Sequence, residues 1–231
     1  MIEAFGPDIW TMDGDDVKMF GMLPFTTRMV IVRTRGGGLW LHSPVRPTPD
    51  RQAAVDQLGS VVHLVAPNKI HSLGIRPWKA LYPLAKVWAS PAFIDRHPDI
   101  AINATLSQGT KTPWGDDIDH CPIEGHRVLD EVVFLHKPSR TLIVTDVIQK
   151  HEIAKTTWIW RRVKAMVGVL GKDGGVPLDI KLTIRDRHAM RRSLEAVLRW
   201  DFDNLILAHG HCLQGGAKDA VARAFEWIMG R

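Results

Sequence analysis

The sequence predicts an α/β fold in a single domain of residues 1–231, on the basis of three observations. A strand, a helix and a second strand follow one another between residues 61 and 89, which is typical of a parallel βαβ unit. Two pairs of strand-like runs, 28–33 with 39–42 and 131–136 with 141–146, are each separated by a short turn, and each pair predicts a hairpin. The chain also has no internal repeat, low-complexity tract or linker that would mark a second domain.

The other elements follow from hydrophobic periodicity and from Gly and Pro as terminators. Gly59 suits the end of one helix, and Pro77 is compatible with the first turn of the next. Residues 91–120 are polar and loop-rich. The remaining expected strands are 9–12, 61–65, 85–89 and 205–208, and the expected helices are 50–58, 76–84, 158–170, 186–200 and 218–229.

The composition limits the kind of site that the chain can build. Apolar residues make up 45% and charged residues 24%, which is a globular balance and excludes a disordered or fibrous protein. Two cysteines, without a CxxC pair, exclude a disulfide scaffold and a thiolate zinc site. Eleven histidines direct any metal chemistry towards imidazole and carboxylate ligands.

Charge and hydropathy give expectations about location and partners. The first residues lack the basic and apolar regions of a signal peptide, and no run of 18 apolar residues exists, so we expect a cytoplasmic protein without a transmembrane segment. The net charge is +5, and residues 158–200 hold ten Lys and Arg against four Asp and Glu. No zinc finger, RNP motif or recognition helix accompanies this basic stretch, so nucleic acid is not the expected partner.

Imidazole and carboxylate groups follow four of the expected strands, where α/β proteins commonly bind ligands. They are His42, His71 in the loop after strand 61–65, Asp146, and the pair His209 and His211. A single histidine at a strand end is more often structural than a ligand, and an aspartate there can cap the next turn. The occurrence of four such strand ends together nevertheless favours a site.

The order of elements resembles the metallo-β-lactamase superfamily, and within it an uncharacterised branch known only as a domain of unknown function. The resemblance runs from about Ile9 to Ile228. It rests on segments 39–43, 61–91, 142–146 and 205–211, with branch-like sequences at 28–29, 41–45, 65–68 and 139–142. It implies a four-layer αβ/βα sandwich, metallo-β-lactamase-like, in which helices flank two mixed sheets and a metal site lies at one edge.

Only part of the family's set of metal ligands has a counterpart in this sequence. The signature His-x-His-x-Asp-His would align with residues 66–71, where only the last histidine, His71, is retained, while Ala66, Asn68 and Ile70 replace the others. Asp146 matches the bridging aspartate and His209 the last histidine. His42 stands where the family has an acid. The mid-chain histidine has no counterpart, although Glu131 and His126 lie near its position.

The function implied is that of a single-metal hydrolase. His71, Asp146 and His209 would be its metal ligands and catalytic residues, holding one zinc or iron ion. A metal-bound water would then attack an ester, amide or phosphoester bond of an unidentified small molecule. His42, Asn68, Glu131 and His211 would orient the ligands or add one more. The oligomeric state is not predicted.

The alternative is a metal-free, catalytically inactive binding or scaffold protein on the same fold. Ile70 in place of an acid favours this reading, because an apolar side chain cannot bind a metal, and a fold does not confer activity. Under it, the basic helix 158–170 would contact an acidic partner or an anionic membrane face. The apolar stripe of this helix is more typical of core packing than of a partner surface.

Overall fold

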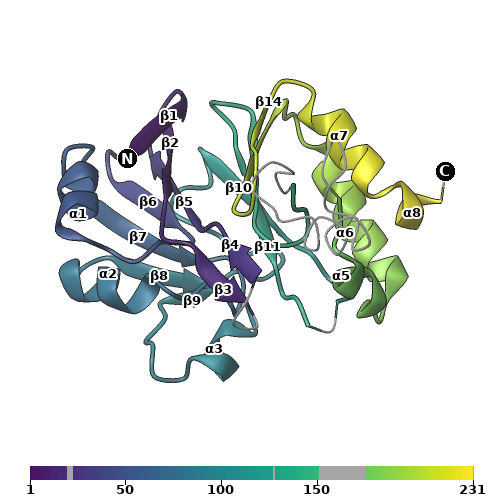
Figure 1. The fold of residues 1–231 in the computed structure, drawn as a ribbon, viewed down its shortest axis with the longest axis horizontal. Coiled ribbons are helices and arrows are strands. Elements are labelled where there is room, and N and C mark those ends of the chain that lie inside the picture. The colour runs from purple at the N-terminus through teal and green to yellow at the C-terminus, as the bar shows by residue number, and fades with distance from the viewer. Residues whose placement is uncertain (20–22, 127, 151–174, 231) are drawn as a thin grey trace. The chain divides into compact units, whose positions relative to one another are not determined.

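The computed structural model describes residues 1–19, 23–126, 128–150 and 175–230. The chain forms two compact units, Met1–Asp119 (unit 1) and His120–Arg231 (unit 2), which we describe separately (Figure 1). The single domain of residues 1–231 remains a prediction. The expected helix 158–170 lies outside the described residues, as does His151, which the sequence predicts to be structural or solvated.

Unit 1 is built on a seven-stranded mixed sheet with the order β1-β2-β5-β6-β7-β8-β9. Pairing is antiparallel from β1 to β6 and parallel from β6 to β9, which confirms the hairpin and the βαβ unit. The strands are β1 (Ile2–Gly6), β2 (Ile9–Asp13), β5 (Arg28–Arg33), β6 (Leu39–His42), β7 (Val61–Ala66), β8 (Lys86–Ala89) and β9 (Ala104–Thr105). A separate hairpin joins β3 (Val17–Met19) to β4 (Leu23–Phe25).

The helices of unit 1 are α1 (Pro49–Asp56), α2 (Ile75–Leu81) and α3 (Phe93–Arg96). Thr48 caps α1, since its side chain accepts a hydrogen bond from the backbone N–H of Arg51 at 3.2 Å. The core of the unit is apolar and fully buried, and its helical members are Val55, Ile75, Trp78 and Phe93. Residues 91–120 are less irregular than expected, because they contain α3, β9 and the beginning of β10.

Unit 2 contains a five-stranded mixed sheet with the order β10-β11-β12-β13-β14. Its strands are β10 (Ile118–Pro122), β11 (Val132–His136), β12 (Thr141–Val144), β13 (Asn204–Leu207) and β14 (Leu213–Gln214). The β11–β12 hairpin is confirmed, and β12 pairs in parallel with β13. This parallel pair brings together two strands that are about sixty residues apart in sequence.

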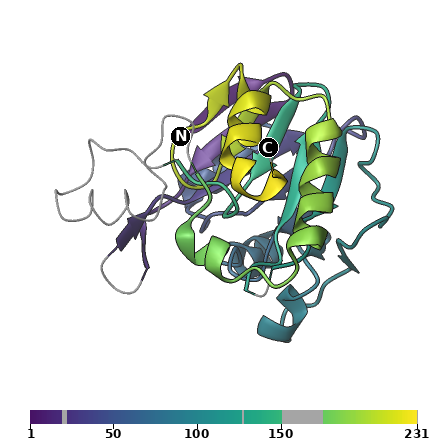
Figure 2. The same ribbon diagram turned by 90° about the vertical axis from the view of Figure 1, so that its right-hand side faces the viewer.

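Helices α5 (Leu178–Leu182), α6 (Arg187–Arg199), α7 (Ala217–Ala224) and α8 (Glu226–Met229) belong to unit 2, and α6, α7 and α8 lie over its strands (Figure 2). Asp186 caps α6 by accepting from the N–H of Ala189 at 2.9 Å. The single terminal helix 218–229 expected from the sequence is wrong in one respect: two short helices meet at Phe225, whose ring is buried. No helix of the described residues is long and apolar enough to cross a membrane.

Within unit 1, His63 lies against two tryptophan side chains. Its ring is 4.6 Å from that of Trp114 and 6.1 Å from that of Trp88, in edge-on arrangements. The indole N–H of Trp88 donates to His63 Nδ1 at 3.2 Å. Burial and, to a smaller extent, the positive charge of Lys86 lower the pKa of His63 to about 4. His63 is therefore a neutral packing residue.

We expect His63 to remain unprotonated down to pH values well below those of an ordinary histidine. Because the unfolded chain takes up this proton near pH 6.5 and the folded chain only near pH 4, His63 lowers stability as the pH falls between these values. Proton NMR titration of the imidazole should give a midpoint near 4. A Trp88→Phe substitution, which removes the donor to Nδ1, should raise it. A midpoint above 6 in the unsubstituted protein would contradict the assignment.

Candidate metal centre

In unit 2, the parallel pairing of β12 with β13 brings Asp146 next to His209. Val144 is in register with Leu207, so the residues two positions beyond each strand end emerge side by side. His209 Nε2 lies 3.2 Å from Asp146 Oδ1, and both side chains are more than nine-tenths buried. The structure thus brings together two of the three residues that the sequence predicted as ligands.

Glu131, which precedes β11, holds the turn that carries Asp146. Its buried carboxylate accepts three consecutive backbone N–H groups: Thr145 donates to Oε1 at 2.6 Å, and Asp146 and Val147 donate to Oε2 at 2.8 and 2.7 Å. These three N–H groups follow the end of β12 and, without Glu131, would be buried with no hydrogen-bond acceptor from this carboxylate. Glu131 is therefore a positioning residue for Asp146.

Burial and, to a smaller extent, the nearby carboxylate of Asp146 raise the pKa of Glu131 to about 7, although the N–H groups of Thr145 and Asp146 oppose this shift. The Glu131 and Asp146 carboxylates therefore disfavour each other's charge in a buried setting. A cation beside Asp146 would relieve this repulsion, because opposite charge stabilises both carboxylates in their ionised form.

The predicted residue His211 differs from its neighbour His209. Its side chain is exposed, and its backbone N–H donates to Lys150 O at 3.2 Å, while Lys150 N–H donates to His209 O at 3.2 Å. Gly210, between the two histidines, has a φ of 105°, a conformation that favours glycine. The two imidazoles are thus in different environments, one buried against Asp146 and one exposed.

In unit 1, His71 follows β7 in a loop organised by Asn68. The buried Asn68 side chain accepts hydrogen bonds from the backbone N–H groups of Ile70 and His71, each at 3.0 Å. This turn fixes the backbone from which the half-buried His71 ring projects. Asn68, at the position of the family's second histidine, therefore supports the loop.

Ser43 is a site residue to which sequence reasoning assigned no role. Its hydroxyl Oγ lies 2.6 Å from His71 Nδ1, and its backbone N–H donates to Val65 O at 2.9 Å. The φ of Ser43 is 50°, an uncommon left-handed conformation for a residue other than glycine. A signal was present in the sequence, since Ser43 directly follows a buried strand that ends in His42.

His42 is completely buried at the end of β6 and stacks on Trp40, with ring centroids 5.4 Å apart. Burial and, to a smaller extent, the neighbouring His71 lower the pKa of His42 to about 3. His42 is therefore neutral. It brings no negative charge to the position where the resembled family has an acid, and this lowers the charge available to hold a second metal ion.

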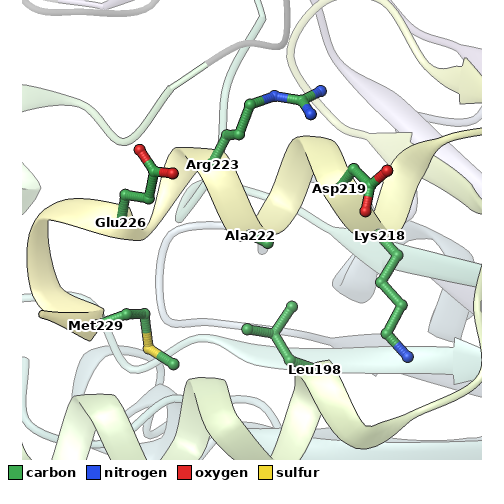
Figure 3. A pocket seen from close by; sticks show the side chains of 7 residues that line it. All are labelled: Leu198, Lys218, Asp219, Ala222, Arg223, Glu226 and Met229. Carbon is green, nitrogen blue, oxygen red and sulfur yellow. The ribbon is translucent and has the colours of Figure 1, made fainter. Parts of the chain in front are cut away.

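Two surface depressions lie away from these residues. One, of about 390 Å³, lies between α6 and the α7–α8 pair, where Leu198 and Met229 face each other and Lys218 reaches in from the side (Figure 3). The other, of about 400 Å³, surrounds Tyr82 at the start of β8. Neither is lined by a predicted site residue, so neither supports the chemistry expected from the sequence.

Comparison with known families matches residues 7–157 to a domain of unknown function, DUF4336. The chain belongs to the DUF4336 family. This agrees with the resemblance to an uncharacterised branch that the sequence indicated. No curated protein matches the DUF4336 chain.

Solved structures resemble the DUF4336 chain over almost its whole length. A metallo-β-lactamase from Pontibacter korlensis matches with a TM-score of 0.67 at 12% identity, covering 100% of this chain and 99% of that one. The DIM-1 metallo-β-lactamase matches with a TM-score of 0.67 at 14% identity, covering 98% and 97%. The flavodiiron protein from Giardia intestinalis matches with a TM-score of 0.70 at 14% identity, covering 100% of this chain and 60% of that one.

These likenesses, together with two mixed sheets that carry helices, confirm the metallo-β-lactamase-like fold predicted from the sequence. At such low identity they establish the fold of the DUF4336 chain and leave its chemistry to be argued from its own residues. The cytoplasmic location stays a prediction.

Proposed function

We propose that the chain is a single-metal hydrolase in which His71, Asp146 and His209 hold one zinc or iron ion. The observation that supports this most directly is the buried contact of 3.2 Å between Asp146 Oδ1 and His209 Nε2. His71 would come to this pair from unit 1, as the sequence resemblance implies. The proposal treats residues 1–231 as one functional domain.

The geometry of the Asp146–His209 pair fits adjacent ligands of a metal. Two ligands about 2.0–2.2 Å from a tetrahedral zinc ion lie about 3.3–3.5 Å apart. Direct hydrogen bonds between a charged imidazole and a carboxylate are shorter, at about 2.7–2.9 Å. The observed 3.2 Å is closer to the first value.

The surroundings of His71 also suit a ligand. A histidine that binds metal through one ring nitrogen commonly donates the N–H of the other to an oxygen atom. Ser43 Oγ is bonded to Nδ1, which would leave Nε2 for the metal. Ser43 would thus set both the tautomer and the orientation of the ring.

A zinc or iron ion bound there would polarise a carbonyl or phosphoryl oxygen and lower the pKa of water to about 7. One carboxylate and two neutral imidazoles leave a divalent ion with a net positive charge, which suits the negative charge that develops when an ester, amide or phosphoester is hydrolysed. Glu131 would keep Asp146 in place, and Ser43 and Asn68 would do the same for His71.

Metal analysis of protein purified without a histidine tag tests this proposal. We expect about one equivalent of zinc or iron. His209→Ala or Asp146→Ala should each weaken binding by more than about 100-fold, because even partners of ligands contribute about 10- to 100-fold. His188→Ala, which alters an exposed histidine of the same unit, is the control. Trace metal that is unchanged by these substitutions would favour the metal-free scaffold instead.

A hydrolysis assay distinguishes a hydrolase from a protein that only binds metal. The loaded protein should hydrolyse at least one of three chromogenic probes: a nitrophenyl ester, a nitroanilide or a bis-nitrophenyl phosphodiester. His209→Ala should abolish this hydrolysis and His188→Ala should not. Stoichiometric metal without hydrolysis of any probe would support a binding function.

A further inference from the structure

A histidine side chain organises the loop between β10 and β11 of unit 2. The Nδ1 atom of His126 accepts hydrogen bonds from two backbone N–H groups, that of Val128 at 3.1 Å and that of Leu129 at 2.6 Å. Both groups belong to the next three residues, so the ring closes a tight turn on its own backbone. This feature is here called the 126–129 turn.

The same arrangement occurs in unit 1 with an asparagine in place of the histidine. Asn68 Oδ1 accepts from the N–H groups of the residues two and three positions later, Ile70 and His71, each at 3.0 Å. His126 Nδ1 accepts from the same two positions along the chain. The two acceptors differ in one property: an amide oxygen does not titrate, whereas imidazole Nδ1 stops accepting when it is protonated.

The second ring nitrogen shows which form of the ring the turn requires. His126 Nε2 lies 2.8 Å from Ile180 O, which can only accept, so Nε2 carries a proton and donates it to this carbonyl. Thr183 Oγ1 lies 2.8 Å from Nε2 and donates to Ile180 O at 3.2 Å. The ring is therefore neutral, and the lone pair of Nδ1 is shared by the two N–H groups of the turn.

Protonation of this ring takes place at Nδ1 and turns an acceptor into a donor that faces two donors. Both hydrogen bonds of the 126–129 turn are then lost, whereas the bond from Nε2 to Ile180 O remains. The ring is half-buried, so water reaches it. Because the closed turn binds only the neutral ring, acid favours the open turn, starting below about pH 6.5, where histidine in an unfolded chain takes up its proton.

The elements around the ring carry charged side chains of both signs. The structure describes five of them: Glu124, Asp130, Lys181, Arg185 and Asp186. Two have contacts of their own, since Lys181 Nζ lies 5.1 Å from the centre of the Trp227 ring and Asp186 caps α6. The side chains of Arg127 and Asp179 lie outside the part of the chain that the structure describes. None of these charges changes in the variants compared below.

The 126–129 turn leads directly to Glu131. The N–H of Ile123 donates to Glu131 O at 2.8 Å, which closes the loop at its base. Leu129, whose N–H is bound by His126, is buried in the core of unit 2 two residues before Glu131. Opening the turn therefore removes a constraint on the backbone that places the Glu131 carboxylate under Asp146.

We propose that His126 is a pH-sensitive switch: its protonation opens the 126–129 turn and loosens the hold of Glu131 on the turn that carries Asp146. The switch needs no bound metal, because every contact in it is made by the chain itself. In the proposed hydrolase it makes the support of one metal ligand sensitive to acid, a consequence that rests on the proposed function.

NMR of the full chain between pH 7.5 and 4.5 tests this proposal. At pH 7.5 the nitrogen shifts of His126 should show the tautomer that is protonated at Nε2. On acidification, the protection of the Leu129 amide against hydrogen exchange, corrected for the intrinsic rate, should fall at least about tenfold, with the midpoint of His126 protonation. A protonated His126 with a Leu129 amide that is still protected would overturn the proposal, as would a ring that stays neutral at pH 4.5.

His126→Asn separates this ring from the other groups that titrate in the same range. Asparagine Oδ1 can accept the same two N–H groups, as Asn68 does, so the Leu129 amide should stay protected at both pH values. Glu131, whose pKa burial and the Asp146 carboxylate raise to about 7, titrates in both proteins and cancels in the comparison. His188→Asn, which alters an exposed histidine of α6, is the control and should keep the full acid response.

The effect on Glu131 is measured in the same samples. The amides of Thr145, Asp146 and Val147 should lose at least about threefold more protection on acidification in the unsubstituted chain than in His126→Asn. An equal loss in both proteins would show that the switch does not reach Glu131. If His126→Asn does not fold, the titration of the unsubstituted chain still decides, because separate midpoints for His126 and the Leu129 amide would overturn the proposal.

Discussion

Replacing Glu131 by alanine is expected to lower the free energy of unfolding by at least about 3 kcal/mol. The substitution leaves the backbone N–H groups of Thr145, Asp146 and Val147 without their acceptor in a buried setting, at a cost of about 1–3 kcal/mol for each. For a chain of this length, the melting temperature should fall by about 6–12 °C. Urea unfolding followed by circular dichroism measures the change.

Two further variants make this prediction specific. Glu131→Gln keeps the size of the side chain but replaces one acceptor oxygen by an NH₂ donor facing a backbone donor, so its loss of stability should lie below that of alanine. Glu124→Ala removes an exposed carboxylate from the same loop and should change stability by no more than about 0.5 kcal/mol. If Glu131→Ala is as mild as Glu124→Ala, the three hydrogen bonds do not hold the turn.

The same substitution has a consequence for the proposed metal site. Because Glu131 fixes the backbone of Asp146, Glu131→Gln should weaken metal binding by about 10- to 100-fold while the protein remains folded. Titration with cobalt(II), followed through its visible spectrum, measures this. Unchanged affinity in a folded Glu131→Gln protein would show that Asp146 does not depend on Glu131.

The inner strands of both sheets, and Asp146 and His209 of the candidate site, could be predicted from the sequence because they depend on local patterns, whereas the short strands β1, β3, β4, β9, β10 and β14 were not predicted. The runs of β-branched residues define β5, β7 and β12 without reference to any partner strand. Asp146 and His209 were identified because each follows a buried strand. The contact between Asp146 and His209 then requires only that β12 and β13 be parallel neighbours, as they are in the structure.

Glu131 was expected to orient the ligands or to add one more, but the groups that it bonds, and the role of Ser43, could not be predicted because these contacts are distant in sequence. Glu131 bonds a turn about fifteen residues away, and Ser43 bonds a histidine 28 residues away. Nothing in the residue type separates a carboxylate that binds metal from one that binds backbone N–H groups. The break between α7 and α8 at Phe225 was not predicted for a similar reason, because the burial of the Phe225 ring depends on the packing of unit 2.

Replacing Gly74 by alanine is expected to lower the free energy of unfolding by about 3 kcal/mol or more. Gly74 precedes α2, and a Cβ atom there would overlap the backbone carbonyl oxygen of Pro44 and lie 2.6 Å from that of Val45. Neither oxygen can rotate away, so α2 must move from segment 44–45. That movement also breaks the hydrogen bond of 2.6 Å that the Trp78 indole donates to Val45 O.

Gly74→Ala should also displace the His71 ring. Segment 44–45 directly follows Ser43, and the Ser43 hydroxyl is bonded to that ring. Gly36→Ala is the control: its Cβ would meet only Thr34 Oγ1, at 3.8 Å, and stability should change by no more than about 0.5 kcal/mol. Val55→Ala provides a second comparison, since it removes core volume from α1 away from Ser43. If Gly74→Ala weakens metal binding more than Val55→Ala does in folded protein, the loss comes from the position of His71. Equal effects would mean that metal binding follows only the overall stability of the protein.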